Sequence, residues 1–335
     1  MPLNVLVTAA SRRVPLIRAF RQAISAMNTG GAVVVADVNA LSPAVYCADR
    51  AWRVSFASDP GYIDELLHIC ERESIGLLVP TIDDELPLVG GARDRFARIG
   101  TRVAASDRRV AEICNDKFET SRYLIGHGIA AARSYLPSAL PQDLQLPLFI
   151  KPRHGRGGVG AFAATNRREL EFFLTYVADA VVQEHLSGPE YTIDMLCDFG
   201  GRPLSVVPRE RVVIRAGVSD RGRTVHHQAL VDIALACAHA FTFVGAVNIQ
   251  CRLVGGHPVI FEINPRFSGG IPLTIAAGAD FPGMLAALAL GRPVPPALGA
   301  FAAGLWMTNY ESSIFVTDCQ IAPLISIGGA IEEVA

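Results

Sequence analysis

Strands and helices alternate along the first third of the chain, and this alternation limits the choice of fold more than any other feature. The expected elements are strands at 4–8, 32–37 and 76–80 and helices at 14–26 and 62–73. Near-continuous apolar strands separated by amphipathic helices are typical of a parallel sheet covered by helices. The turn at 8–13 does not carry the G-x-G-x-x-G pattern of dinucleotide-binding folds, so binding of NAD is not expected.

The length of the chain, 335 residues, exceeds what one hydrophobic core usually supports, so we expect two or three modules. Half of the residues are hydrophobic and 19% are charged, which excludes a largely disordered chain. The formal net charge is −2, so there is no global basic field to hold nucleic acid or an anionic membrane. A proline-rich stretch at 137–147 indicates a boundary between modules.

The cysteines argue for a reducing compartment. There are seven, an odd number, widely scattered and without a C-x-x-C pair, which argues against both a disulfide framework and a zinc site. The first residues run directly into a strand with no signal segment, and no stretch approaches the roughly 20 apolar residues of a membrane span. We therefore expect a cytoplasmic protein with no membrane partner.

Lysine is rare in this chain. Of the 30 basic residues 28 are arginine, and only Lys117 and Lys151 are lysine. A lysine kept where arginine is the rule suggests a site that needs a compact ammonium group. The alternative is chance, because two residues are a small sample.

Acidic residues follow the strand expected at 76–80. Asp83 and Glu85 lie at its carboxyl end, where ligands bind in open α/β sheets, so they are candidates for holding an amine-bearing substrate. An equally good interpretation is that they cap the next helix and interact with its dipole.

A glycine-rich tip follows Lys151. The strand 148–152 ends beside this lysine, and Gly155, Gly157 and Gly158 lie in the basic turn to a second apolar run. Glycines let backbone N–H groups approach phosphate oxygens, so the turn is a candidate phosphate loop. It is not a Walker A loop, because the lysine precedes the glycines.

The strand expected at 181–186 is a candidate for binding a nucleoside. A strand edge can bond a purine through its main chain, and Glu190, a few residues later, can accept hydrogen bonds from ribose hydroxyls. These residue types are common, so the structural alternative is the stronger one when this segment is taken alone.

A hairpin centred on residue 256 predicts a metal site. Two alternating runs flank Gly255-Gly256, and pairing about residue 256 places Gln250 opposite Glu262, with Asn264 on the same face. Oxygen ligands of this kind, completed by phosphates and water, suit Mg²⁺. Asn248 joins this polar face, and the residues expected on the apolar face are Ile249, Cys251, Phe261 and Ile263. The alternative is a solvent-facing sheet surface.

Together these segments resemble the ATP-grasp superfamily, and within it proteins like the large subunit of carbamoyl-phosphate synthetase. The matching segments are NDK at 115–117, FIKPRHGRGGVG at 149–160, VVQEHLSGPEYTIDM at 181–195, VNIQCRL at 247–253 and PVIFEINPRFSGG at 258–270. The resemblance implies an α/β (α+β) chain with an ATP-grasp fold. The implied domains are a Rossmann-like pre-ATP-grasp domain at 1–105, linker helices and a lid with the glycine-rich loop at 106–190, and a C-terminal subdomain with the metal site at 191–335.

The resemblance also implies roles for individual residues. For ATP these are Lys117 and Lys151 on the phosphates, Gly155, Gly157 and Gly158 in the flap, Glu184 and Leu186 beside adenine, and Glu190 on ribose. For Mg²⁺, with Mn²⁺ as an alternative ion, they are Gln250, Glu262 and Asn264, although many relatives have an acid where Gln250 stands. For the substrates they are Asp83, Glu85, Arg215, Ser268 and Gly269, with Arg266, Arg215 and Lys151 as the catalytic residues.

Arg215 is one of several arginines in the segment 209–227, which holds five. An arginine fork suits a carboxylate or an acyl phosphate, and relatives have a segment similar to the one around Arg215. A solvated basic hairpin is an equally good interpretation for each of these arginines.

The implied chemistry is formation of an acyl phosphate from a carboxylate and ATP, followed by attack of an amine or another nucleophile. The expected partners are thus a small-molecule carboxylate and an amine, with a homodimer as a candidate assembly. A complete carbamoyl-phosphate synthetase is excluded, because the chain has neither duplicated halves nor a glutamine-amidase segment. A phosphotransferase that stops at phosphorylation and a non-catalytic nucleotide-binding subunit remain as alternatives.

Overall fold

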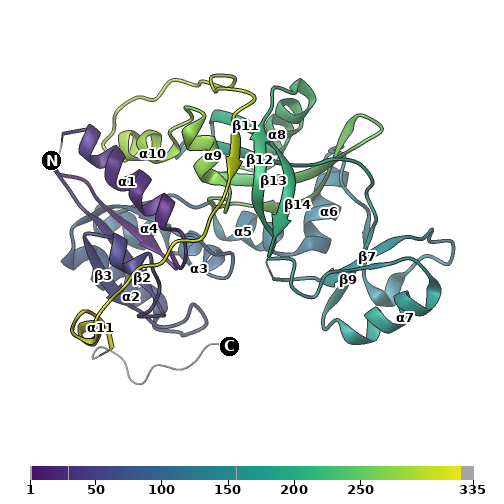
Figure 1. Ribbon diagram of the computed structural model, residues 1–335, viewed down its shortest axis with the longest axis horizontal. Helices are drawn as coiled ribbons and strands as arrows, with labels where there is room; N and C mark the ends of the chain where they lie inside the picture. The colour runs from purple at the N-terminus through teal and green to yellow at the C-terminus, as the bar shows by residue number, and fades with distance from the viewer. Residues whose placement is uncertain (1, 29, 156, 326–335) are drawn as a thin grey trace. The chain divides into compact units, whose positions relative to one another are not determined.

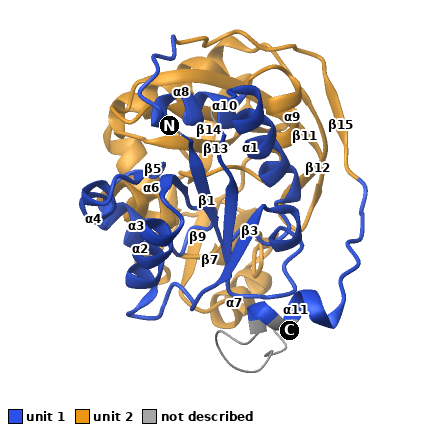
Figure 2. Ribbon diagram, turned by 90° about the vertical axis from the view of Figure 1, so that its left-hand side faces the viewer, with its two compact units in different colours: residues 1–108, 280–295, 310–335 blue, residues 109–279, 296–309 orange. Residues whose placement is uncertain are grey.

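The computed structural model describes residues 2–28, 30–155 and 157–325, and it divides into two compact units (Figure 2). Unit 1 consists of residues 1–108, 280–295 and 310–335, and unit 2 of residues 109–279 and 296–309. The first crossing between the units, at residue 108, lies close to the boundary expected at 105. The return of 280–295 to unit 1 was not anticipated from the sequence.

Unit 1 is built on a parallel sheet of five strands in the order β3-β2-β1-β4-β5 (Figure 1). The strands are β1 (Asn4–Thr8), β2 (Val33–Asp37), β3 (Arg50–Arg53), β4 (Ile75–Val79) and β5 (Arg102–Val103). The helices are α1 (Val14–Ala26), η1 (Val45–Cys47), α2 (Tyr62–Arg72), α3 (Leu86–Gly91), α4 (Arg93–Arg98), α10 (Phe281–Ala289) and α11 (Asp318–Ile325). The parallel, helix-covered sheet expected from the sequence is therefore present.

Burial explains why these strands could be recognised. Every residue of β2 is buried, and four of the five residues of β1 are buried, as central strands of a parallel sheet require. Helix α1 buries one stripe, with Leu16, Phe20 and Ile24 at helical spacing. Strand β3, with only half-buried and exposed residues, lies at the edge of the sheet and gives no such apolar signal.

Unit 2 contains a six-stranded antiparallel sheet in the order β14-β13-β10-β11-β12-β15 and a four-stranded sheet in the order β6-β9-β7-β8. The strands are β6 (Ser134–Tyr135), β7 (Leu148–Pro152), β8 (Phe162–Ala164), β9 (Ala180–Glu184), β10 (Glu190–Cys197), β11 (Pro203–Arg215), β12 (Val218–Thr224), β13 (Gly245–Val254), β14 (His257–Asn264) and β15 (Trp306–Thr308). The helices are α5 (Arg108–Asn115), α6 (Lys117–Gly126), η2 (Pro137–Ala139), α7 (Arg167–Tyr176), α8 (Gln228–Ala240) and α9 (Ile271–Ala276).

Each sheet of unit 2 has its own apolar core. Helix α8 packs on β10, β11 and β14, and its residues Leu230 and Cys237 join Ile193 and Ile249 of the large sheet. Helix α7 covers the small sheet, at the right of Figure 1, through Leu170. Because α8 fills one face of the large sheet with apolar contacts, the polar residues of its strands gather on the other face.

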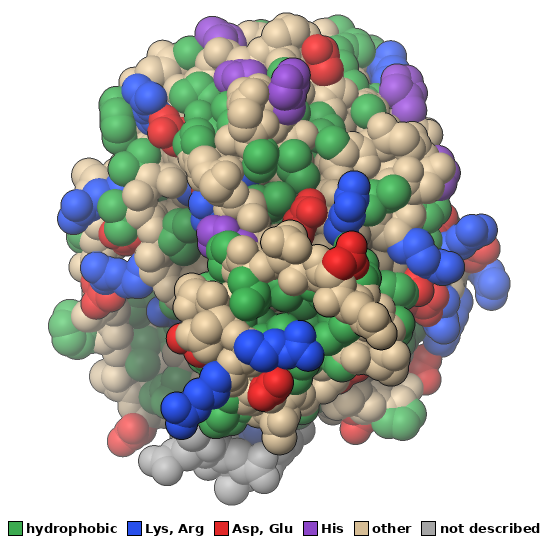
Figure 3. Space-filling model, turned by 90° about the vertical axis from the view of Figure 1, so that its right-hand side faces the viewer, with side chains coloured by type: hydrophobic (Ala, Val, Ile, Leu, Met, Phe, Trp, Pro, Cys, Tyr) green, Lys and Arg blue, Asp and Glu red, His purple; other side chains and the backbone are tan. Residues whose placement is uncertain are grey.

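The surface carries charges of both signs. Figure 3 shows one face of the molecule, on which basic and acidic side chains are interspersed. Within the described part of the chain, no helix combines the length and the apolar character needed to cross a membrane.

Candidate functional site

The hairpin β13–β14 has a register that changes once along its length. Next to the turn Cys251 pairs with Ile260, but one residue further Gln250 pairs with Glu262, which leaves Phe261 as the extra residue of a β-bulge. The predicted pairing of Gln250 with Glu262 is therefore confirmed. It depends on the bulge, because an unbroken ladder from this turn would place Gln250 opposite Phe261.

The bulge also corrects one predicted residue. Phe261 was expected on the apolar face, but the core contains Ile260 and Ile263 from this strand. The centre of the Phe261 ring instead lies 5.7 Å from Nζ of Lys151. A period-two pattern cannot reveal this change, because one inserted residue reverses the face of every residue beyond it.

The face of the large sheet opposite α8 is polar across its central strands. In the paired rows of β10, β11 and β13, the polar residues on this face include Glu190, Thr192, Asp194, Arg209, Asn248, Gln250 and Arg252. Asn248 is 2% exposed and Asn264 6% exposed, so this part of the face is covered by protein. The alternative of a solvent-facing sheet surface is therefore not supported.

Lys151 lies inside unit 2 beside this face. It is 7% exposed, and its Nζ donates to Oε1 of Gln183 at 2.9 Å and to the carbonyl oxygen of Phe261 at 3.4 Å. Burial lowers the pKa of Lys151 to about 8, and the nearby carboxylate of Glu262 opposes this shift. An ammonium group buried in this way is suited to binding an anion.

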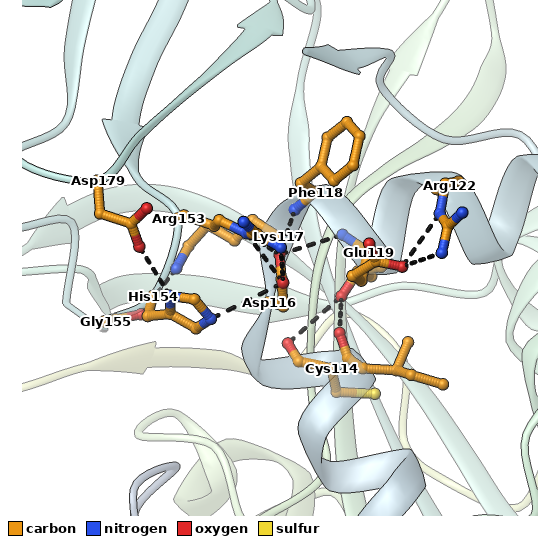
Figure 4. A network of polar contacts seen from close by, with 12 residues as sticks. Cys114, Asp116, Lys117, Phe118, Glu119, Arg122, Arg153, His154, Gly155 and Asp179 are labelled. Atoms are coloured by element: carbon orange, nitrogen blue, oxygen red, sulfur yellow. Dashed lines mark hydrogen bonds and ion pairs between the residues drawn. The ribbon is translucent and has the colours of Figure 1, made fainter. Parts of the chain in front are cut away.

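A charged clamp joins the start of α6 to the end of β7 (Figure 4). Asp116 caps α6 by accepting hydrogen bonds from the backbone N–H groups of Phe118 and Glu119. Arg153 donates to both carboxylate oxygens of Asp116, with the shortest distance 2.6 Å. Burial raises the pKa of Asp116, but the hydrogen bonds from Arg153 and from the helix outweigh it, so the net shift is downward.

The clamp positions Lys117. The backbone N–H of Lys117 donates to the carbonyl oxygen of Arg153 at 3.1 Å, and Nζ of Lys117 donates to the carbonyl oxygen of Gly155 at 2.8 Å (Figure 4). Lys117 is 9% exposed. The second lysine of the chain is thus tied to the base of the glycine-rich loop, although it comes from a different element.

The glycine-rich loop needs its glycines. Gly155, Gly157 and Gly158 have φ values of 115°, 71° and 69°, in a region that favours glycine, while Arg156 lies outside the described residues. The loop also approaches the β11–β12 turn closely. A Cβ atom added to Gly217 would lie 2.6 Å from the carbonyl carbon of Gly157, so neither a side chain nor a bulkier turn fits there.

Two buried arginines of β11 lie on the polar face. Arg211 donates from Nη1 to Oε1 of Gln250 at 2.5 Å and lies 3.2 Å from Oε1 of Glu190. Its Nη2 donates to the carbonyl oxygen of Gly217 at 2.7 Å, which connects the polar face to the turn beneath the loop. Arg209 is 1% exposed and pairs with Asp194 at 2.7 Å.

The predicted substrate residues fall into two groups. Ser268 is buried and accepts a hydrogen bond from Nη2 of Arg209 at 3.0 Å, and a Cβ atom on Gly269 would lie 2.7 Å from the side chain of Val218. Arg215, the preferred arginine, lies exposed at the end of β11. The structure therefore brings Arg211 into contact with Gln250, one of the predicted metal residues, and Arg209 into contact with Ser268.

The spacing of these two arginines in the sequence already indicates that they lie together. Arg209 and Arg211 are two residues apart in a strand, so they share a face. Because β11 pairs with β10, and β10 with β13, this face is the one that carries Gln250.

The predicted nucleoside residues lie on β9 and at the start of β10. Glu184 is half-buried at the end of β9, and Leu186 is 9% exposed. The carboxylate of Glu190 already contacts Arg211 on one oxygen and Arg252 on the other, at 2.5 Å. A ribose bound to Glu190 would therefore meet a carboxylate that two guanidinium groups hold in place.

The three predicted metal ligands differ in their readiness to bind an ion. Glu262 is half-buried, and among the described residues no side chain donates a hydrogen bond to its carboxylate. Oδ1 of Asn264 accepts from Nη2 of Arg266 at 3.2 Å, a long contact that an ion can replace. The donor set of Glu262 and Asn264 therefore fits Mg²⁺.

Gln250 fits an ion less well. Its single carbonyl oxygen accepts from Arg211 at 2.5 Å, so an ion bound to the same oxygen would lie within about 5 Å of the guanidinium group. At that separation a double and a single positive charge repel by about 7 kcal/mol for an effective dielectric constant of about 20.

In unit 1 the expectation for Glu85 is wrong. Its carboxylate is fully buried and accepts from the hydroxyl of Tyr62 at 2.5 Å and from the backbone N–H of Thr81 at 2.8 Å. Burial raises its pKa, since the charged form loses water. Glu85 therefore organises the turn after β4 and is not available to a substrate. Asp83, 5% exposed, stays a prediction.

Two family models match the chain. One, described as "ATP-grasp in the biosynthetic pathway with Ter operon", matches residues 177–312. The other, described as "PylC-like, N-terminal domain", matches residues 5–104. The two matches fall on the segments that build the large sheet of unit 2 and the parallel sheet of unit 1.

Individual proteins are similar to the chain at low identity. The arginine-specific carbamoyl phosphate synthase large chain of Bacillus subtilis is 20% identical over 235 residues, which cover 64% of this chain and 22% of that protein. The chain thus spans about a fifth of the length of the curated relatives it matches.

Solved structures share the fold. The biotin carboxylase domain dimer of Hydrogenobacter thermophilus 2-oxoglutarate carboxylase, in complex with MgADP, ADP and bicarbonate, has a TM-score of 0.70 at 16% identity, covering 90% of this chain and 73% of that one. The L-amino acid ligase of Bacillus licheniformis has a TM-score of 0.68 at 17% identity, covering 86% and 74%. The chain thus combines a segment that matches an ATP-grasp family model, 177–312, with one that matches a PylC-like N-terminal domain, 5–104.

Proposed function

We propose that the protein is an ATP- and Mg²⁺-dependent ligase that activates a carboxylate as an acyl phosphate and joins it to an amine. The observation that carries the proposal is the polar face of the large sheet. It gathers the carboxylate of Glu262, to which no described side chain donates a hydrogen bond, and the buried ammonium of Lys151 in the same unit as the glycine-rich loop. A carboxylate and an ammonium group that lie together with part of their hydrogen-bonding capacity unused are typical of a functional site rather than of a group kept for stability.

In this proposal the phosphates of ATP lie between the loop and the two lysines. Lys117 and Lys151 neutralise phosphate charge, the N–H groups around Gly155, Gly157 and Gly158 donate to phosphate oxygens, and Glu262 holds Mg²⁺ with Asn264. The remaining roles are Glu184 and Leu186 for adenine, Glu190 for ribose, Arg266 for the γ-phosphate, and Asp83, Arg215, Ser268 and Gly269 for the substrates. Mn²⁺, which favours the same oxygen ligands, is a candidate substitute for Mg²⁺.

The reaction has two steps. An oxygen of the substrate carboxylate attacks the γ-phosphorus, the bond to the β–γ bridging oxygen breaks, and ADP leaves with its negative charge neutralised by the cations. The amine nitrogen then attacks the carbonyl carbon of the acyl phosphate, phosphate leaves, and the nitrogen loses a proton. Arg266, which donates a hydrogen bond to Asn264, would stabilise the charge on the transferred phosphoryl group.

The nucleophile is proposed to be an amine because of the chemistry named for one neighbour, an L-amino acid ligase. A carboxylate–thiol ligase would use the same first step. The homodimer also remains a proposal, and one neighbour is described as a domain dimer. We propose a cytoplasmic location, because the seven cysteines remain thiols.

The test is release of ADP with a panel of carboxylates, each measured with and without amines. The proposed ligase needs a carboxylate for ADP release and an amine for the stable product. A phosphotransferase would accumulate a stable phosphorylated product without a second substrate. Binding of Mg-ATP with no turnover across the panel would favour a non-catalytic subunit, and no magnesium-dependent binding of ATP would refute the nucleotide site itself.

A further inference from the structure

Arg211 lies on the polar face next to Gln250, where its positive charge affects what the side chain of Gln250 can bind. It is 8% exposed, lies on β11, and donates to Oε1 of Gln250 at 2.5 Å. It is also held from two other sides, by Glu190 at 3.2 Å and by the carbonyl oxygen of Gly217 at 2.7 Å. A guanidinium group held by three partners has little freedom to move aside.

The hydrogen bond uses the one atom of Gln250 that can bind a metal. A side-chain amide offers a carbonyl oxygen as acceptor, while its nitrogen only donates. Turning the amide over would point this nitrogen at the guanidinium of Arg211, which also only donates, so the hydrogen-bond network fixes the orientation. Metal binding at Gln250 and the bond from Arg211 therefore compete for one oxygen.

The ligands on β14 meet weaker competition, because Oδ1 of Asn264 accepts from Arg266 only at 3.2 Å and Glu262 offers two carboxylate oxygens. Glu262 lies opposite Gln250 across the strands and attracts both Lys151 and Arg211 electrostatically, but no described side chain donates a hydrogen bond to its carboxylate. The two sides of the hairpin thus differ, with an acid left open on β14 and an amide already occupied on β13.

We propose that Arg211 supplies the positive charge that a second metal ion would bring through Gln250, so that a single divalent ion accompanies the nucleotide, held by Glu262 and Asn264. The inference rests on the proposed nucleotide site and concerns how many ions that site holds. Arg211 acts through its charge and its contact with Gln250, which makes it a charge-compensating residue of the nucleotide site.

The number of bound ions can be counted directly. Mn²⁺ is titrated into the full chain with a saturating non-hydrolysable ATP analogue, and free Mn²⁺ is measured by electron paramagnetic resonance. We expect one tightly bound Mn²⁺ for each chain, with an affinity that changes less than threefold in Gln250→Ala and falls more than tenfold in Glu262→Ala. Two tightly bound ions, or a tenfold loss of affinity in Gln250→Ala, would overturn the inference.

A second pair of variants separates Arg211 from its neighbour. Arg211→Met and Arg252→Met each remove one arginine from Glu190, but only the first frees the oxygen of Gln250. We expect a second Mn²⁺ to bind in Arg211→Met and not in Arg252→Met, and the same count in both variants would contradict the role of Arg211. If the unmodified chain binds no Mn²⁺ with the nucleotide analogue, the proposed function itself fails, whereas a count of two leaves that function intact.

Discussion

At the scale of single residues, Lys151 shows how burial affects the positive charge of the candidate site. Its ammonium group is buried and has a pKa of about 8, against the usual 10.5, because the surrounding protein solvates the charge poorly. A bound phosphate would restore the charged form. Binding of the nucleotide and protonation of Lys151 are therefore linked.

This linkage predicts a pH dependence. As pH rises through about 8 the lysine of the free protein loses its proton, so the affinity for Mg-ATP should fall, approaching tenfold for each pH unit beyond. Isothermal titration calorimetry at several pH values between about pH 7 and pH 9.5 tests this, because each pH unit above about 8 should lower the affinity by about tenfold. In Lys151→Arg the affinity should be lower and flat over the same range, because a guanidinium does not titrate there.

The same shift has the opposite effect on stability. Between about pH 8 and pH 10.5 the unfolded chain binds more protons at Lys151 than the folded chain, so this residue makes the free energy of unfolding rise with pH. Urea denaturation at several pH values, compared with Lys151→Met, would isolate the contribution. A contribution that falls with pH in this window would show that Lys151 is not buried as a titrating amine.

Glu262 offers the sharpest substitution. Glu262→Gln keeps the size of the side chain but removes the charge that holds Mg²⁺, so ADP release should fall by at least about 100-fold. Stability should change modestly, because no described side chain donates a hydrogen bond to this carboxylate and what is lost is its attraction for Lys151 and Arg211. Glu210→Gln is the control, since Glu210 lies on the same sheet with Arg223 as its partner. Equal activity of the two variants would refute the metal assignment.

At the scale of elements, the start of α6 is stabilised twice. Asp116 both caps the helix and pairs with Arg153, whereas the side chain of Asn166 caps α7 by accepting a hydrogen bond from the backbone N–H of Glu169. Asp116→Ala should therefore lower the free energy of unfolding by more than Asn166→Ala, for which about 1 kcal/mol is expected. Urea denaturation of both variants gives the comparison, and Asp116→Asn should retain the cap while losing the ion pair.

The glycine-rich loop and the β11–β12 turn should act together. Gly217→Ala forces a side chain toward Gly157, whereas Gly128→Ala has the same kind of backbone, with φ values of 73° and 72°, and open space around it. Both variants share a left-handed strain of about 1 kcal/mol. Only Gly217→Ala should therefore speed the release of nucleotide and tryptic cleavage within 153–160. Identical release rates would show that this contact does not hold the loop.

The elements also show what a sequence can predict. The first strand and the first helix have the bounds expected from their apolar patterns, because local burial determined both. The hairpin β13–β14 was predictable from its turn, but the bulge at Phe261 was not. A bulge depends on what lies beyond the strand, here the ammonium of Lys151 that bonds the carbonyl oxygen of the extra residue.

At the scale of the whole molecule, the candidate nucleotide residues all belong to unit 2. The helix α10 returns to unit 1 and packs on α1 and β4, a contact between distant segments that no local pattern contains. This explains why the return of residues 280–295 to unit 1 was not predicted when 191–335 were assigned to one C-terminal subdomain. It also means that only one unit holds the groups that would bind ATP.

Binding of Mg-ATP should therefore protect one unit selectively. Hydrogen exchange should slow in peptides covering 115–120, 148–164, 181–190 and 260–268, and stay unchanged in the strands β1, β2 and β4. At a ligand concentration of about 100 times Kd, the stabilisation amounts to about 2.7 kcal/mol. Uniform protection of both units, measured by mass spectrometry, would place the nucleotide elsewhere.

The two lysines have a practical consequence for the entire surface. Both side-chain amines of the chain are less than one-tenth exposed, so an acylating reagent such as an activated ester meets no readily accessible lysine. Slow modification would then report openings of the interior around Lys117 and Lys151, and bound nucleotide would shield both. Modification of lysine side chains, which in most proteins labels the surface, would here report on the interior around these two residues.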